Sequence, residues 1–188
     1  LVRCTSSRPK MNPAKLDAVL LTHRHLDHCG DVNIIIEAMT EGGTRKKGIL
    51  FTPKQALEED PVVLNYVRKF LSKIEILKEW GTYQLNGLNI SAPVRHKHPV
   101  EAYGINFKSS LCTISWVIDT LFSPELLEHY RGDVMILNTV RLRSENDEDK
   151  GIYHLNLDDV RLMVKELRPK VTILTHFGMK MLKARPHE

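Results

Sequence analysis

The chain has 188 residues and a mass of 21.6 kDa, which predicts a single compact domain over residues 1–188. Apolar residues make up 42% and charged residues 27%, and this globular balance excludes disordered, collagen-like and coiled-coil chains. The net charge of +4 neither indicates nor excludes nucleic acid, and the apolar runs are too short to cross a bilayer. Three cysteines without a CxxC pair favour a reducing, cytoplasmic location.

The first part of the chain alternates apolar runs of strand length with helical patterns. It predicts strands over 16–21 and 48–52, and helices over 31–39 and 61–71. The run over 16–21 is continuously apolar, as in a strand buried on both faces, and it leads directly into the polar cluster 22–31. Gly42 and Gly43 end the first helical pattern.

The middle of the chain is rich in predicted strands, and the alternation of helices and strands returns after it. Consecutive strands joined by hairpins are predicted over 74–80, 82–85, 88–94, 103–107 and 111–119. Helices over 124–130 and 156–167 then alternate with strands over 134–138 and 171–175. Asn156 suits the start of the last helix, because its side chain can accept from free backbone N–H groups. The fold class is α/β, with mixed or antiparallel strands in the middle.

A cluster of metal-binding residue types follows the first strand. The stretch T-H-R-H-L-D-H contains His23, His25, Asp27 and His28. Imidazole nitrogen and carboxylate oxygen are preferred ligands of zinc and its first-row neighbours. In an extended stretch the first three of these residues would share a face while His28 points away, so we expect two adjacent metal sites. A solvated polar turn is the alternative interpretation.

This H-x-H-x-D-H motif at a strand end resembles the metallo-β-lactamase superfamily of αββα sandwich hydrolases. Three further motifs follow in the family's order. His98 begins H-P-V-E-A-Y-G-I, which is similar to the third motif of the ribonuclease Z branch. Asp119 ends a predicted strand and precedes Thr120, and His176 ends V-T-I-L-T-H. Because family members extend beyond these motifs on both sides, the resemblance also implies that this chain is truncated at both ends.

The resemblance implies a dinuclear centre of two divalent ions, most plausibly Zn²⁺, with Mn²⁺ or Fe²⁺ as alternatives. It assigns His23, His25 and His98 to one ion, Asp27, His28 and His176 to the other, and Asp119 to both. His96 competes with His98, and we expect it to lie behind the ligands or on the surface. We expect His129 and His187 to be exposed to solvent.

The implied centre favours an anionic substrate, because two divalent ions, two aspartates and a bridging hydroxide sum to +1. The fitting reaction is hydrolysis of a phosphodiester by that hydroxide. Asp27 is a candidate for proton transfer. His154 resembles the family's non-ligand histidine that protonates the leaving group, and a histidine in a loop or capping the following helix is an equal alternative.

Other branches of the superfamily remain as alternatives. A thioester or lactone hydrolase shares this ligand set, and a non-catalytic scaffold in an RNA-processing complex is disfavoured because all seven ligand positions are filled. Asp119 lies only 21 positions after His98, too few for a long tRNA-clamping arm, so a small phosphodiester is as plausible as RNA. The mixed charges of loop 141–150 predict an exposed connection and a poor phosphate clamp. The protein is compatible with a homodimer.

Overall fold

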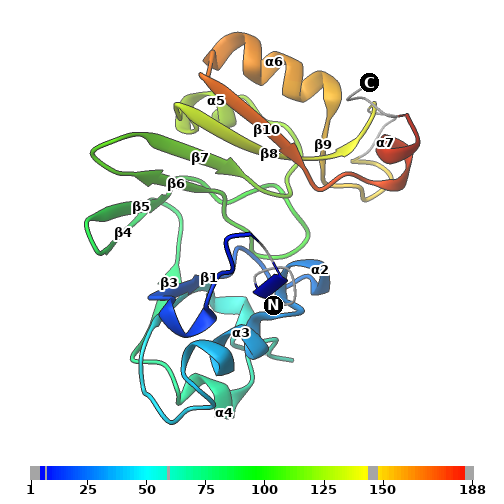
Figure 1. Ribbon diagram of the computed structural model, residues 1–188. Helices are drawn as coiled ribbons and strands as arrows, with labels where there is room; N and C mark the ends of the chain where they lie inside the picture. Colours follow the sequence, from blue (N-terminus) through cyan, green and yellow to red (C-terminus); the bar gives the residue numbers. More distant parts are fainter. Residues whose placement is uncertain (1–4, 7, 59, 144–147, 185–188) are drawn as a thin grey trace. The chain divides into compact units, whose positions relative to one another are not determined.

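The computed structural model describes residues 5–6, 8–58, 60–143 and 148–184 (Figure 1). The chain divides into two compact units, Leu1–Leu77 and Lys78–Glu188, and each contains its own β-sheet with accompanying helices. The predicted α/β fold class is therefore confirmed. Among the described residues, no helix has the length and apolar content that crossing a membrane requires.

The first unit is built on a parallel three-stranded sheet in the order β1-β2-β3. Its strands are β1 (Ala18–Leu20), β2 (Ile49–Pro53) and β3 (Lys73–Leu77). Its helices are η1 (Pro13–Lys15), α2 (Leu26–Cys29), α3 (Val32–Met39), η2 (Lys54–Ala56) and α4 (Asn65–Arg68). Helix α3 buries Val32, Ile36 and Met39, whose spacing places them on one face against the core of this unit.

Two predictions for the first unit are wrong. The helix expected over 61–71 shrinks to α4, because the backbone before it bonds elsewhere: Val62 N donates to Ala56 O, and Val62 O accepts from Asn33 Nδ2. Strand β3 belongs to no hairpin, since it pairs in parallel with β2. Both outcomes depend on partners distant in sequence, which a local pattern does not contain.

The second unit is a larger mixed sheet in the order β10-β8-β7-β6-β5-β4, with β9 beside β8. The antiparallel strands are β4 (Gly81–Leu85), β5 (Leu88–Ala92), β6 (Ile105–Lys108) and β7 (Thr113–Val117). The strands parallel to β7 are β8 (Val134–Arg141), β9 (Leu155–Asn156) and β10 (Val171–Thr175). The predicted hairpin at Asn86 and Gly87 is confirmed, and it joins β4 to β5.

The helices in the described part of the second unit are α5 (Glu125–His129), α6 (Leu157–Leu167) and α7 (Met179–Ala184). Helices α5 and α6 lie side by side near β8 and β10, and their buried side chains join those of the sheet in one core (Figure 1). Asn156 caps α6 as expected, accepting from the backbone of Asp158 and Asp159. Because β7, β8 and β10 are parallel, their carboxyl ends share one edge of the sheet.

Candidate metal centre

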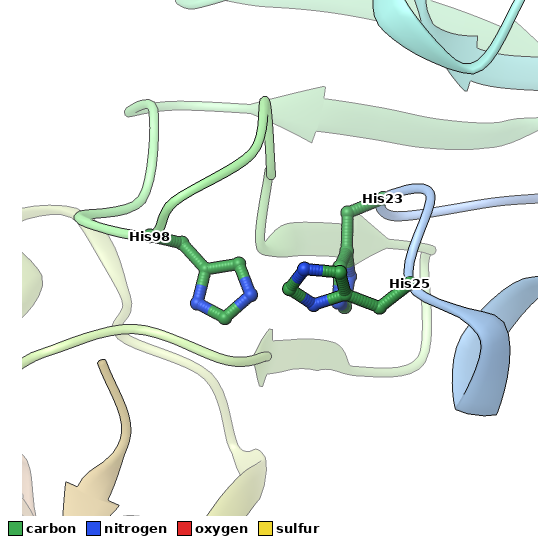
Figure 2. A group of neighbouring side chains, drawn as sticks. All are labelled: His23, His25 and His98. Atoms are coloured by element: carbon green, nitrogen blue, oxygen red, sulfur yellow. The ribbon is translucent and has the colours of Figure 1, made fainter. Parts of the chain in front are cut away.

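In the first unit, the histidine cluster directly follows β1. Leu21 N donates to Phe51 O at 2.8 Å, so the pairing with β2 continues to the residue before Thr22. His23 is fully buried, and its Nδ1 lies 3.2 Å from Thr22 Oγ1. The His25 ring meets the His23 ring edge-on, with centroids 4.9 Å apart, and Figure 2 shows both rings emerging from the same turn.

The chain stops being extended after His25, and the prediction of an extended stretch through His28 is wrong. His25 itself has extended backbone angles, but its carbonyl accepts from the N–H of Cys29, which closes the first turn of α2. Asp27 and His28 therefore lie on a helical turn. Potential ligand atoms of His23 and His25 lie within 4.8 Å of each other, and so do those of Asp27 and His28.

The outer side of this turn is held by Arg24 and Cys29. Cys29 Sγ donates to Arg24 O at 3.4 Å, and the Arg24 guanidinium donates to Asp60 O at 3.0 Å. Burial raises the pKa of the Cys29 thiol, which keeps it protonated and unreactive. Cys29 thus stabilises the turn and has no catalytic role.

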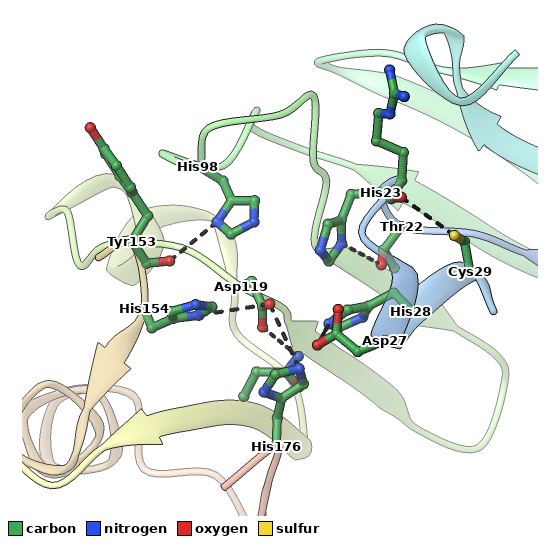
Figure 3. Close-up of polar contacts among 12 residues, drawn as sticks. Thr22, His23, Asp27, His28, Cys29, His98, Asp119, Tyr153, His154 and His176 are labelled. Atoms are coloured by element: carbon green, nitrogen blue, oxygen red, sulfur yellow. Dashed lines mark hydrogen bonds and ion pairs between the residues drawn. The ribbon is translucent and has the colours of Figure 1, made fainter. Parts of the chain in front are cut away.

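In the second unit, Asp119 and His176 lie just beyond the carboxyl ends of β7 and β10. Asp119 is 1% exposed, and its Oδ2 lies 3.7 Å from His176 Nε2 (Figure 3). This distance is too long for a hydrogen bond. It is close to the roughly 3.4 Å that separates two donors of a tetrahedral ion with bonds of about 2.1 Å. His176 has a positive φ of 61°, a strained conformation typical of functional sites.

The other oxygen of Asp119 is held by a residue that the sequence analysis missed. Asn138 on β8 donates from Nδ2 to Asp119 Oδ1 at 2.9 Å. Trp116 Nε1 donates to Asn138 Oδ1 at 3.3 Å, and this fixes which end of the amide faces Asp119. A polar residue in the otherwise apolar run V-M-I-L-N could have revealed this role, because a buried amide needs partners.

Two contacts hold the loop after β5 that carries His98, one made by His98 itself and one by the neighbouring Lys97. His98 Nδ1 lies 3.2 Å from the carbonyl oxygen of Tyr153. A carbonyl can only accept, so Nδ1 carries the proton and Nε2 keeps the lone pair that a metal needs. Thr120 ties this loop to the end of β7, because its Oγ1 accepts from Lys97 N at 3.1 Å. Thr120 therefore links the position of His98 to that of Asp119.

His96 is buried close to Asp119 and His98 in the second unit, so of its two expected positions the surface is excluded. It is 3% exposed, and its Nε2 lies 2.9 Å from Tyr130 Oη. Burial lowers the pKa of His96 to about 3, so the ring is neutral in the folded protein. Gly104 faces this pair, and a Cβ there would lie 2.6 Å from both His96 Nε2 and Tyr130 Oη. The glycine of the A-Y-G motif is thus required for packing.

His154 lies beside Asp119, with Nδ1 3.7 Å from Asp119 Oδ2 (Figure 3). Its ring stacks with that of His176 at a centroid distance of 6.1 Å. The alternative that His154 caps α6 is wrong, because Asn156 has that role.

The remaining two histidines lie elsewhere. His129 is half-buried rather than exposed, and its ring packs edge-on against Trp80 with centroids 4.9 Å apart. His187 lies outside the described residues.

Comparison with known sequences places these donors in a family context. The family model described as "Beta-lactamase superfamily domain" matches residues 3–177, which include every predicted ligand. The chain belongs to the metallo-β-lactamase superfamily. The members of this superfamily are metal-dependent hydrolases, and the predicted family and fold are confirmed.

A relative and two solved structures illustrate the match. Protein MJ1374 of Methanocaldococcus jannaschii is 31% identical over 180 residues, which are 92% of this chain and 66% of that protein. The chain thus spans just under two thirds of the relative's length. The metallo-β-lactamase fold protein YhfI from Bacillus subtilis has a TM-score of 0.74 at 18% identity, covering 91% of this chain and 68% of YhfI. Human tRNase Z, short form, has a TM-score of 0.69 at 12% identity, covering 92% of this chain and 76% of the enzyme.

Proposed function

We propose that the chain is a dinuclear, metal-dependent phosphodiesterase that uses the ligands implied by the family resemblance. One ion would be held by His23, His25 and His98, the other by Asp27, His28 and His176, and Asp119 would contribute to both. The donor set of five histidines and two aspartates suits Zn²⁺ best, with Mn²⁺ or Fe²⁺ as alternatives. The disulfide-free Cys29 and Cys112 of the described chain fit a reducing, cytoplasmic location.

The environment of Asp119 carries the proposal. A carboxylate that is 1% exposed requires a positively charged partner or several hydrogen-bond donors. Asn138 serves one of its oxygens, and the other faces His176 at a distance that suits two ligands of one ion better than a hydrogen bond. A divalent cation satisfies both the buried charge and the spacing.

The chain's own residues supply orientation and proton transfer. When bound, two divalent ions lower the pKa of water and stabilise negative charge on phosphoryl oxygens. Asn138 and the Tyr153 carbonyl hold Asp119 and His98 in fixed orientations before substrate arrives. Asp27, whose side chain is 61% exposed, accepts a proton from the attacking water, and His154 donates one to the departing alkoxide.

The charge of the proposed centre and the similarity to a solved structure both support a substrate class. Two divalent ions outweigh the charges of Asp27 and Asp119, so the centre attracts an anionic phosphodiester. The likeness to human tRNase Z supports a phosphodiester such as RNA. Thioesters and lactones are the alternative substrates, and they would make the protein a hydrolase of a different branch.

Metal analysis and hydrolysis of bis(p-nitrophenyl) phosphate by the full-length protein test the proposal. We expect about two ions per chain, with hydrolysis that a chelator abolishes and Zn²⁺ or Mn²⁺ restores. His176→Ala should lose metal and reduce turnover by at least about 100-fold. His129→Ala is the matched control, because it removes the same ring at a site facing Trp80. Protein that binds no metal and leaves this ester intact would refute the enzyme assignment.

A second variant shows whether His154 is a metal ligand or the general acid. His154→Ala should retain both ions and slow turnover most for esters with poor leaving groups, because only those need a proton on the departing oxygen. Loss of an ion would instead make His154 a ligand. Side-by-side assays on RNA, cyclic phosphodiesters, a thioester and a lactone show which class of substrate the protein hydrolyses. Turnover of only the thioester or the lactone would overturn the phosphodiesterase assignment.

A further inference from the structure

A small basic cavity lies at the carboxyl edge of the sheet in the second unit. It has a volume of about 250 Å³ and is lined by Arg141, Leu142, Arg143 and Lys180. Arg141 is the last residue of β8, and Lys180 belongs to α7. We refer to this cavity as the basic pocket. It lies outside the donor set of the proposed centre.

The fold brings these residues together through a close approach of two backbones. After His176 the chain turns back, and Gly178 N donates to Val140 O at 3.2 Å. A Cβ at position 178 would lie 2.7 Å from that oxygen, so the approach depends on glycine. Figure 1 shows α7 beside the end of β8, where Lys180 joins the two arginines.

The charge of the basic pocket indicates an anionic ligand. Three of its lining residues are cations at neutral pH, and none of the described lining residues is acidic. The nearby acidic Glu148 is engaged elsewhere, with Oε1 2.5 Å from Lys97 Nζ. Guanidinium groups match the geometry of phosphate oxygens in bidentate pairs, and the cavity has room for a phosphate group with several waters at about 30 Å³ each.

The register of the sheet places the basic pocket near His176. Thr175 is in register with Asn138, and Arg141 lies three residues farther along β8, or roughly 10 Å at about 3.3 Å per residue. A phosphate in the basic pocket would therefore lie on the same sheet edge as Asp119 and His176, within reach of the same substrate molecule.

We propose that the basic pocket binds a second phosphate group of the substrate. This inference rests on the proposed phosphodiesterase function and narrows its substrate class. The substrate is an oligonucleotide or another ester with two separate phosphates, whereas a cyclic phosphodiester with a single phosphate leaves the pocket unused. Among the described residues of loop 141–150, whose mixed charge predicts a poor phosphate clamp, Arg141 and Arg143 line the basic pocket, and Glu148 pairs with Lys97.

The test compares the dinucleotide UpU with pUpU, which carries an additional 5′ phosphate. For the full-length protein we expect kcat/KM for pUpU to exceed that for UpU by about tenfold or more, corresponding to 1.4 kcal/mol. The double variant Arg143→Gln, Lys180→Gln should abolish this preference while leaving UpU hydrolysis unchanged. The control Lys108→Gln, Arg131→Gln removes two exposed charges of the same unit elsewhere and should retain the preference.

The outcomes separate the inference from the function on which it rests. Hydrolysis of UpU with no preference for pUpU, or with a preference that survives in the double variant, overturns the second phosphate site alone. If neither dinucleotide is hydrolysed, the phosphodiesterase function is refuted. Pyrophosphate binding, measured by calorimetry, then tests whether the basic pocket binds phosphate. Binding that is at least tenfold weaker in the double variant supports a phosphate site, and equal binding in both proteins overturns it.

Discussion

Replacing Tyr130 with Phe tests the buried contact between Tyr130 and His96, on the loop that carries His98. The change removes one oxygen atom from a side chain with no exposed surface. It leaves His96 Nε2 without its partner at 2.9 Å, and it also removes the hydrogen bond to the backbone of Gly104. Each buried polar group left unpaired costs about 1–3 kcal/mol. We therefore expect the free energy of unfolding to fall by about 2–4 kcal/mol.

Urea unfolding followed by tryptophan fluorescence measures this loss, because both tryptophans, Trp80 and Trp116, report on the second unit. The matched control is Tyr153→Phe, which deletes the same atom from a half-buried ring whose hydroxyl points away from His98 (Figure 3). The control should stay within about 0.5 kcal/mol of the unmodified protein. An equally small effect for Tyr130→Phe, at an unchanged denaturant slope, would refute the role assigned to this hydroxyl.

Three further predictions concern the second unit. Asn138→Leu should weaken metal affinity by about 10–100-fold in a chelator competition, because Asp119 Oδ1 loses its donor; unchanged affinity would contradict this. Asn156→Ala should cost about 1 kcal/mol in urea, and Asn156→Ser much less, because serine still caps α6. Burial and the hydrogen bond to Glu101 raise the pKa of Tyr103 to about 12. The native state thus keeps a proton that the unfolded chain loses near pH 10, so stability should fall between pH 10 and 12, and Tyr103→Phe should flatten that fall.

The sequence predicted those parts of the fold that local periodicity specifies. The strands that precede His23, Asp119 and His176 are short apolar runs, and the residues that follow them are metal-binding types. Helix α2 was missed because four residues carry no helical period, and it begins only where the His25 carbonyl finds a donor in Cys29. Long-range partners decide such short elements.

Supporting residues of the candidate site were harder to predict than the donors. Asn138 and His96 act through contacts with Trp116 and Tyr130, which lie 22 and 34 residues away in sequence. The local sequence pattern does not identify a partner that is distant in sequence, although a buried polar side chain implies that one exists. The candidate donors are easier to recognise in the sequence, because metal chemistry restricts ligands to a few residue types.

The loop that carries His98 has a closed base. His96 N donates to Ala102 O at 2.9 Å, and Arg95 pairs with Tyr103 in an isolated β-bridge. The two ends of the loop are thus clamped together independently of its tip. Lengthening a surface loop with fixed ends costs little free energy, since the entropy of closure grows only logarithmically with length. The segment after His98 can therefore change in length or sequence, by evolution or by design, at little cost in stability and without displacing the base of the loop.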